Sequence, residues 1–212
     1  MLTTTNKYPF FDLSEVISDP DLLIRDYKRV KPLKAGSFVH GFGLDAEYSK
    51  WKRFYNGAET HGPVMLKQFL NNPLVISFYS KHWQQFGLQL LNQLNAIQNE
   101  VKVNGGNLLV INAEIENDLN KIAWENSLSL NFYFDDKNEI AELFNIYSET
   151  DPLWNKYSGI DVNVPLLATY VINPAKQVIY GHVDTTLAMA LPADQVISSV
   201  YKSALVHNKK SA

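Results

Sequence analysis

The residues whose types and spacing could do chemistry form a short run, Tyr79 to Gln84, between a predicted strand and a predicted helix. Lys81 and His82 stand at the start of that helix, where free backbone N–H groups and the helix dipole attract anions. The functional interpretation is therefore a binding site at the helix N-terminus. The structural alternative, which we favour because such helix starts are common, has Trp83 in the core, Gln84 capping the helix and Lys81 and His82 solvated.

The 212-residue chain contains no cysteine, which narrows the chemistry further. Disulfides, zinc–thiolate sites, iron–sulfur clusters and thiol nucleophiles are all excluded. We also expect no metal and no cofactor, because the histidines lack metal-ligand spacing and no phosphate-binding loop or dinucleotide fingerprint occurs. The five histidines are His40, His61, His82, His182 and His207. An acidic cluster, Asp135, Asp136 and Glu139, is expected to cap a helix rather than to bind calcium.

Composition indicates a globular protein with one sizeable core: 46% of residues are hydrophobic, 19% are charged, and the net charge is −3. The acidic balance argues against a nucleic-acid or membrane partner. No signal peptide or membrane-spanning run is visible, so we expect a cytoplasmic protein. An aromatic and basic stretch, Tyr48 to Tyr55, is expected to pack onto its own domain or onto a second subunit, which would make a homodimer.

Apolar periodicity predicts alternating strands and helices, followed by a hairpin and a last helix. Strands are expected at 74–78, 108–111, 130–134, 169–172 and 177–183, and helices at 83–103, 116–126, 138–146 and 192–205. A further helix beginning at Ser18-Asp19-Pro20 and a strand and turn over 37–44 are expected in the N-terminal part. The predicted organisation is an N-terminal extension (1–60), one domain (61–207) and a polar tail (208–212).

This order of elements is similar to the thioredoxin fold, and four sequence blocks resemble the peroxiredoxin-like branch of the alkyl hydroperoxide reductase/thiol-specific antioxidant family. Residues 77–87, S-F-Y-S-K-H-W-Q-Q-F-G, resemble the family string S-F-Y-R-G-x-W-C-P-Y-C. Residues 138–144, 168–172 and 179–184 are similar to its N-E-V-A-x-x-F helix, its P-A-T-F-V-I strand and its I-x-x-x-x-V-D strand. The resemblance covers roughly residues 33 to 206. It implies an α/β, thioredoxin-like fold: a central mixed sheet flanked by helices, with an N-terminal extension.

The departures from the family pattern fall where the family carries its chemistry. The position of the peroxide-reacting cysteine is Gln84, the second cysteine position is Gly87, and the cis-proline position is Leu167. Glutamine has no proton to lose near neutral pH and is a negligible nucleophile. A cis bond before a residue other than proline costs about 3 kcal/mol, so we expect a trans bond before Leu167. The resemblance therefore implies a pseudoenzyme that has lost thiol peroxidase activity.

Two functional hypotheses remain open. In the first, the chain is a redox-inactive binding or interaction module whose partner is an unidentified small molecule or protein. In the second, it is an enzyme that uses the same pocket for non-redox chemistry, with Tyr79, His82 and Gln84 as the groups to suspect, although the sequence shows no general-base partner for His82. An antioxidant or oxidoreductase label taken from the family alone would describe ancestry rather than this chain.

Overall fold

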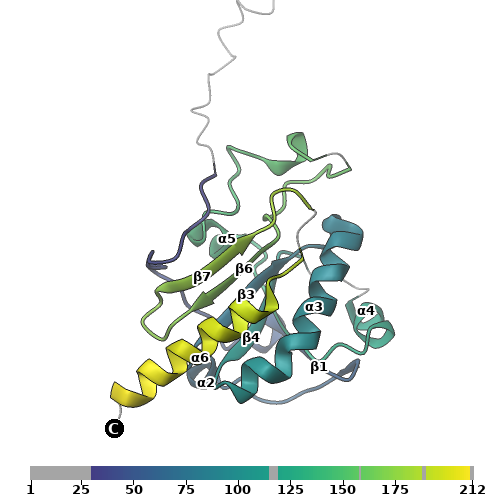
Figure 1. Cartoon of the computed structure of the whole chain (residues 1–212). Helices are drawn as coiled ribbons and strands as arrows, with labels where there is room; N and C mark the ends of the chain where they lie inside the picture. Colours follow the sequence, from purple (N-terminus) through teal and green to yellow (C-terminus); the bar gives the residue numbers. More distant parts are fainter. Residues whose placement is uncertain (1–29, 115–118, 158, 188–189, 211–212) are drawn as a thin grey trace, which may run out of the picture.

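A computed structural model describes residues 30–114, 119–157, 159–187 and 190–210 (Figure 1). Its centre is a seven-stranded mixed sheet with the strand order β2-β1-β5-β4-β3-β6-β7. The helix predicted to begin at Ser18-Asp19-Pro20 lies outside the described residues, as do the first residues of the helix predicted over 116–126.

Three parallel strands form the middle of the sheet: β3 (Leu74–Tyr79), β4 (Asn107–Asn112) and β5 (Asn131–Phe134). Every residue of β3 is buried, which is why the strand reads in the sequence as one apolar run rather than as an alternating pattern. The connections between these strands contain α3 (Gln84–Val103) and α4 (Leu119–Glu125), as right-handed crossovers between parallel strands require. The predicted strands at 74–78, 108–111 and 130–134 are therefore confirmed.

Antiparallel strands complete both sides of the sheet. On one side β6 (Ala168–Ile172) pairs with β3 and β7 (Val178–Val183), which confirms the predicted hairpin. On the other side β1 (Trp51–Tyr55) pairs with β5 and with the short β2 (Ala58–Glu59). The turn between β1 and β2 is Asn56-Gly57, with φ of 47° and 83°, the left-handed pair that a two-residue type I′ hairpin requires.

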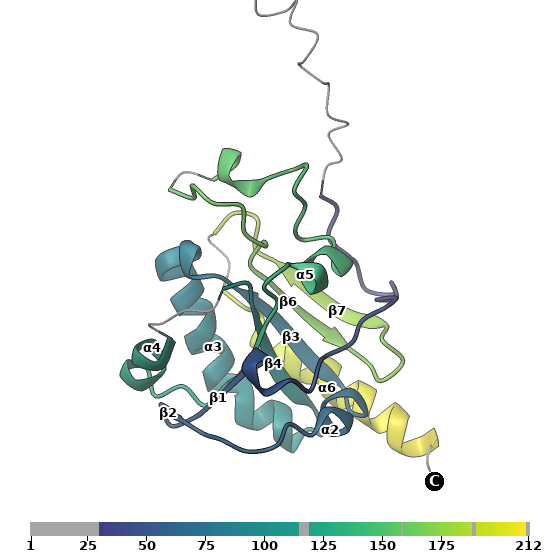
Figure 2. The ribbon, with the colours of Figure 1, turned by 180° about the vertical axis from the view of Figure 1, so that it is seen from behind.

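Helices cover both faces of the sheet. The long helices α3 and α6 (Ala193–Lys210) lie on the face seen in Figure 1, and α2 (Leu66–Leu70) and α5 (Glu139–Leu143) lie on the opposite face, seen in Figure 2. The helix α3 buries residues three and four apart against the sheet, as its apolar spacing predicted. These are Leu90, Leu91, Leu94, Ile97 and Val101. Asp135 caps α5, because its Oδ2 accepts hydrogen bonds from the N–H groups of Ile140 (2.9 Å) and Ala141 (3.1 Å), as expected for the acidic cluster.

The N-terminal part contributes more to the sheet than its irregular sequence suggested. Trp51 and Phe54 are buried, so the aromatic stretch does pack onto its own domain. The strand predicted within 37–44 is reduced to one bridge between Phe38 and Gln177, followed by turns. The boundary at residue 60 stays a prediction, although β1 and β2, which precede it, are hydrogen-bonded into the same sheet as the later strands.

Candidate functional site

The candidate site begins where β3 ends, at a buried serine. Ser80 Oγ accepts a hydrogen bond from the His82 N–H (3.2 Å) and so caps a short 3-10 helix, Lys81–Trp83, that leads into α3. The same hydroxyl donates to Glu114 Oε1 at 3.0 Å. Ser80 is thus a buried junction that joins the end of β3 to the residues that follow β4.

Trp83 occupies the core, as the structural interpretation predicted. Its side chain is 1% exposed, and its Nε1–H donates to the Pro165 carbonyl oxygen at 2.8 Å. The Tyr157 ring meets it edge-on, with the ring centroids 5.2 Å apart. An indole with its N–H satisfied and its faces packed anchors the loop 145–167 over the start of α3.

Gln84, which the sequence resemblance places at the position of the family's reactive cysteine, is exposed but does not cap the helix. The prediction of a cap was wrong, because Gln84 is the first residue of α3, and Trp83 before it has helical dihedrals and no capping side-chain bond. Gln84 has φ of 49° and ψ of −125°, a conformation that side chains other than glycine's rarely adopt. Strain of this kind costs on the order of 1–3 kcal/mol and often occurs at functional positions.

Gly87, which the sequence resemblance places at the family's second cysteine position, leaves no space for a side chain. A Cβ atom there would lie 2.9 Å from Tyr79 Cε2 and 3.1 Å from the Ser80 carbonyl oxygen. Tyr79 itself is 4% exposed, so its ring fills the volume beside Gly87 rather than lining an open site. A side chain at residue 87 could therefore not be accommodated without moving Tyr79.

His82 has an acidic partner that the sequence did not reveal. Its Nε2 lies 3.3 Å from Glu114 Oε1, and the two side chains are 27% and 24% exposed. Glu114 is separated from His82 by a strand and a helix, but both follow the carboxyl ends of adjacent parallel strands, which meet at one edge of the sheet. That placement is the signal that could have identified Glu114. Lys81, by contrast, is exposed, and no described ion pair includes it.

Leu167, which the sequence resemblance places at the family's cis-proline position, lines a small cavity between α3, β6, β7 and the segment after β7. The described peptide bonds are all trans, as expected for Leu167. The cavity measures about 70 Å³, room for several water molecules or for a ligand of a few heavy atoms. Its apolar wall consists of Phe86, Leu90, Leu167, Leu187 and Leu191, and its polar groups belong to Gln89, Gln93, Thr169, His182 and Asp184.

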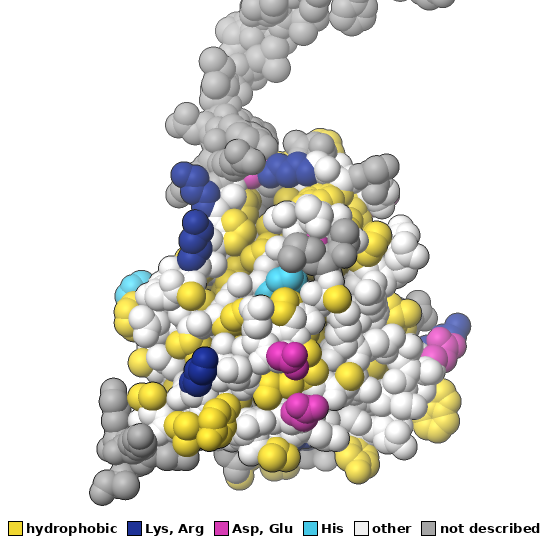
Figure 3. All heavy atoms as spheres, viewed as in Figure 1, with side chains coloured by type: hydrophobic (Ala, Val, Ile, Leu, Met, Phe, Trp, Pro, Cys, Tyr) yellow, Lys and Arg dark blue, Asp and Glu magenta, His cyan; other side chains and the backbone are white. Residues whose placement is uncertain are grey.

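Two titratable side chains, His182 and Asp184, are among the described residues that line this cavity, and neither was predicted as a site residue. Burial lowers the pKa of His182, and the nearby Asp184 carboxylate raises it in part. Its neutral imidazole is therefore favoured, with one nitrogen that donates and one that accepts. Figure 3 views the face that carries α3 and α6, where charged side chains are scattered among apolar and uncharged ones.

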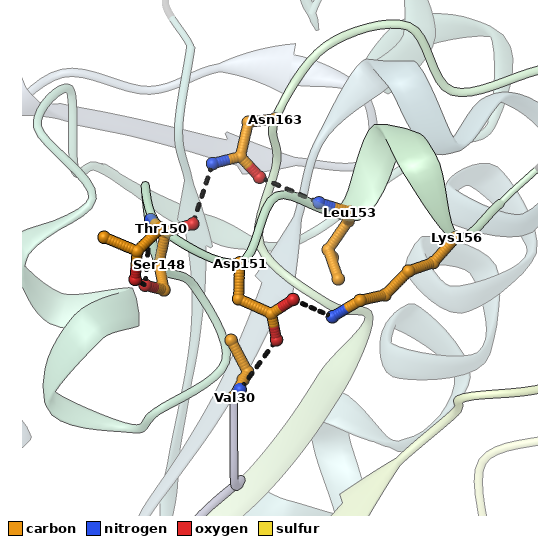
Figure 4. Close-up of polar contacts among 7 residues, drawn as sticks. All are labelled: Val30, Ser148, Thr150, Asp151, Leu153, Lys156 and Asn163. Atoms are coloured by element: carbon orange, nitrogen blue, oxygen red, sulfur yellow. Dashed lines mark hydrogen bonds and ion pairs between the residues drawn. The ribbon is translucent and has the colours of Figure 1, made fainter. Parts of the chain in front are cut away.

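A buried carboxylate holds the loop 145–167 in place (Figure 4). Asp151 is fully buried; its Oδ2 accepts from the Val30 N–H at 2.7 Å, and its Oδ1 lies 2.5 Å from Lys156 Nζ. Asn163 braces the same loop, since its amide donates to the Ser148 carbonyl (3.0 Å) and accepts from the Leu153 N–H (3.1 Å). Because this loop carries Tyr157, the Asp151–Lys156 pair indirectly positions the ring that packs against Trp83.

The mixed sheet with helices on both faces is a thioredoxin-like fold. Gln84 stands at the first turn of α3 in this fold. The AhpC/TSA family matches residues 49–181, more than half of the chain, and the chain belongs to that family. No curated protein matches it. The predicted family and fold class are confirmed, and the chain is a member without cysteine.

Solved peroxiredoxins share the fold at low sequence identity. The Xanthomonas campestris bacterioferritin comigratory protein is 18% identical, covers 76% of this chain and 98% of its own, and has a TM-score of 0.52. The Mycobacterium tuberculosis peroxidoxin BcpB is 14% identical, with coverages of 80% and 97% and a TM-score of 0.54. The Plasmodium vivax 2-Cys peroxiredoxin is 16% identical, with coverages of 84% and 85% and a TM-score of 0.55. At these identities the comparison establishes the fold alone.

Two features are absent from the part of the chain that the structure describes. Within 30–114, 119–157, 159–187 and 190–210, no three His, Asp or Glu side chains are grouped so that they could hold a metal ion. None of the helices in these ranges combines the length and apolarity needed to cross a membrane.

Proposed function

We propose that this chain is a small-molecule-binding protein that keeps the peroxiredoxin scaffold and has lost thiol peroxidase activity. The observation that carries the proposal is the state of the two cysteine positions: Gln84 is not a nucleophile, and the space beside Gly87 is filled by Tyr79. Reduction of a peroxide by this family requires a thiolate, and the chain has none.

The cavity beside Leu167 supports a binding role and indicates the class of ligand. One wall is apolar, and the other presents amide, hydroxyl, imidazole and carboxylate groups. Among the described residues that line it there is no Lys or Arg, so the cavity suits a small neutral molecule with an apolar body and a hydrogen-bonding end better than an anion.

The experiment has two arms. Purified protein, given hydrogen peroxide or an organic hydroperoxide and a dithiol, is expected to consume peroxide no faster than buffer; turnover well above buffer contradicts the proposal. Fragments of about five to ten heavy atoms are then screened by NMR. Saturable shifts are expected at Gln89, Thr169 and His182, and His182→Phe, which fills the cavity, should abolish them. The exposed His40→Phe is the control, and loss of binding in that variant as well would count against the cavity.

A second candidate function is an enzyme for non-redox proton transfer, and it is favoured by the His82–Glu114 contact of 3.3 Å. A carboxylate within hydrogen-bonding reach of an imidazole can orient the ring, as a general acid or base requires. A survey with activated esters and amides would test it. Any activity found should fall at least tenfold in His82→Asn and in Glu114→Gln. If His82→Ala and Tyr79→Phe leave every detected activity unchanged, this function is excluded.

The homodimer and the cytoplasmic location also stay proposals. Sedimentation of the full chain tests the first, and fractionation of the source cell tests the second.

A further inference from the structure

A second hollow, separate from the cavity beside Leu167, lies at the far end of α3. It measures about 290 Å³ and is lined by the β1–β2 turn, the C-terminal half of α3 and the segment just before β5. Its residues are Tyr55, Asn56, Asn95, Gln98, Asn99 and Ser129. With 1.5 Å of rise per residue, Gln98 lies about 20 Å along the helix from Gln84. We propose that this groove binds a neutral saccharide.

The walls of the groove are held in place by hydrogen bonds between segments far apart in the sequence. Asn95 Oδ1 accepts from the Ser129 N–H at 2.7 Å, and Asn95 Nδ2 donates to the Ser127 carbonyl at 3.4 Å. Ser129 Oγ accepts from the Asn56 N–H at 2.8 Å. The turn at Asn56 is itself constrained, because a side chain at Gly57 would lie 2.9 Å from the Trp124 Cα. The groove is therefore preformed, which lowers the entropic cost of binding.

Gln98 is the observation that points to a ligand. The residue is 4% exposed, yet its Oε1 is buried with no hydrogen-bond partner among the described residues. A buried acceptor without a donor costs free energy, and a native protein tolerates it where water or a ligand supplies the donor. A hydroxyl group entering the groove would supply one.

The other lining groups select the class of ligand. None of the described residues that line the groove is charged, so a phosphate or carboxylate would find no counter-charge among them. The Asn99 amide and the Ser129 hydroxyl can each donate and accept, which matches the paired donor and acceptor character of neighbouring sugar hydroxyls. Tyr55 is 73% exposed and offers an aromatic ring against which the C–H face of a pyranose can pack.

The test titrates the full chain, labelled with nitrogen-15, with neutral probes: glucose, galactose, mannose, xylose, N-acetylglucosamine, maltose and cellobiose. At least one saccharide is expected to produce saturable shifts at Asn56, Gln98, Asn99 and Ser129. Gln98→Leu should weaken that binding at least tenfold. Gln85→Leu makes the same change at an exposed position of the same helix and should leave the affinity unchanged.

Tyr55→Ala is a second test, needed because Gln98→Leu changes a buried residue and could impair folding. Tyr55 is exposed, so its loss should weaken binding without lowering the melting temperature. The proposal is overturned if no probe gives saturable shifts or if the shifts map to the cavity beside Leu167. It is also overturned if Gln98→Leu and Tyr55→Ala bind as tightly as the Gln85→Leu control. A crystal soaked in the best probe that shows only water at Gln98 Oε1 would also overturn it.

Discussion

The charge pair between Asp151 and Lys156 makes an asymmetric prediction, because one partner is fully buried and the other is partly exposed. The Asp151 side chain is 0% exposed, the Lys156 side chain is 31% exposed, and their charged atoms lie 2.5 Å apart. Removing the cation leaves a carboxylate in the interior without this counter-charge, whereas removing the carboxylate leaves an ammonium that water can still reach.

The magnitudes follow from that difference. Breaking a buried pair by deleting one partner costs about 3–5 kcal/mol, and partial exposure of Lys156 places Lys156→Met near the lower end, about 3 kcal/mol. Asp151→Asn should cost only about 1–2 kcal/mol, because the amide oxygen can still accept from the Val30 N–H, 2.7 Å away in the wild type. The double variant should be more stable than Lys156→Met alone, since it also removes the buried carboxylate charge that has lost the Lys156 cation.

Urea unfolding at pH 7, followed by tryptophan fluorescence, measures these free energies. Lys121→Met is the matched control: Lys121 pairs with Glu125 at 3.9 Å on the surface, so its loss should cost less than about 0.5 kcal/mol. Hydrogen exchange at the Val30 amide gives a local readout, and its protection should fall more in Asp151→Ala than in Asp151→Asn. If Lys156→Met costs no more than Asp151→Asn, the argument from burial is wrong.

Three further predictions concern other parts of the structure. Tyr170→Phe should leave stability unchanged or raise the melting temperature, because the buried Tyr170 hydroxyl has no hydrogen-bond partner among the described residues; a loss above 1 kcal/mol in thermal unfolding would show that it does have one. Gly87→Ala should destabilise by about 1–3 kcal/mol because of the contact with Tyr79, and Gly87→Ala/Tyr79→Leu should recover part of that loss in urea. His182 has a lowered pKa in the folded state, so its stabilising contribution is present above its ordinary value of 6.5 and is lost as the pH falls through the folded pKa. His182→Gln should flatten the melting-temperature profile below the ordinary histidine pKa of 6.5, and an unchanged slope would count against burial of the ring.

Much of the fold could be read from local pattern. The runs at 74–78 and 108–111 are apolar because both faces of those strands are covered, and α3 shows helical spacing because one of its faces packs on the sheet. The pairing of β1 with β5 was not predicted, since antiparallel edge strands depend on a distant partner. The Asn56-Gly57 turn was the local signal that could have identified the β1–β2 hairpin.

The sequence by itself determined that this protein has no thiolate chemistry, because a chain without cysteine has no thiolate, whatever its fold. Only the tertiary structure decided that the space beside Gly87 is closed by Tyr79 and that His82 meets Glu114. The same holds for the buried charge of Asp151, which is next to a proline in an irregular stretch of sequence. The physical reason is common to all three. Local periodicity reports which face of an element is covered, whereas space, burial and charge pairing depend on which distant segments the sheet brings together.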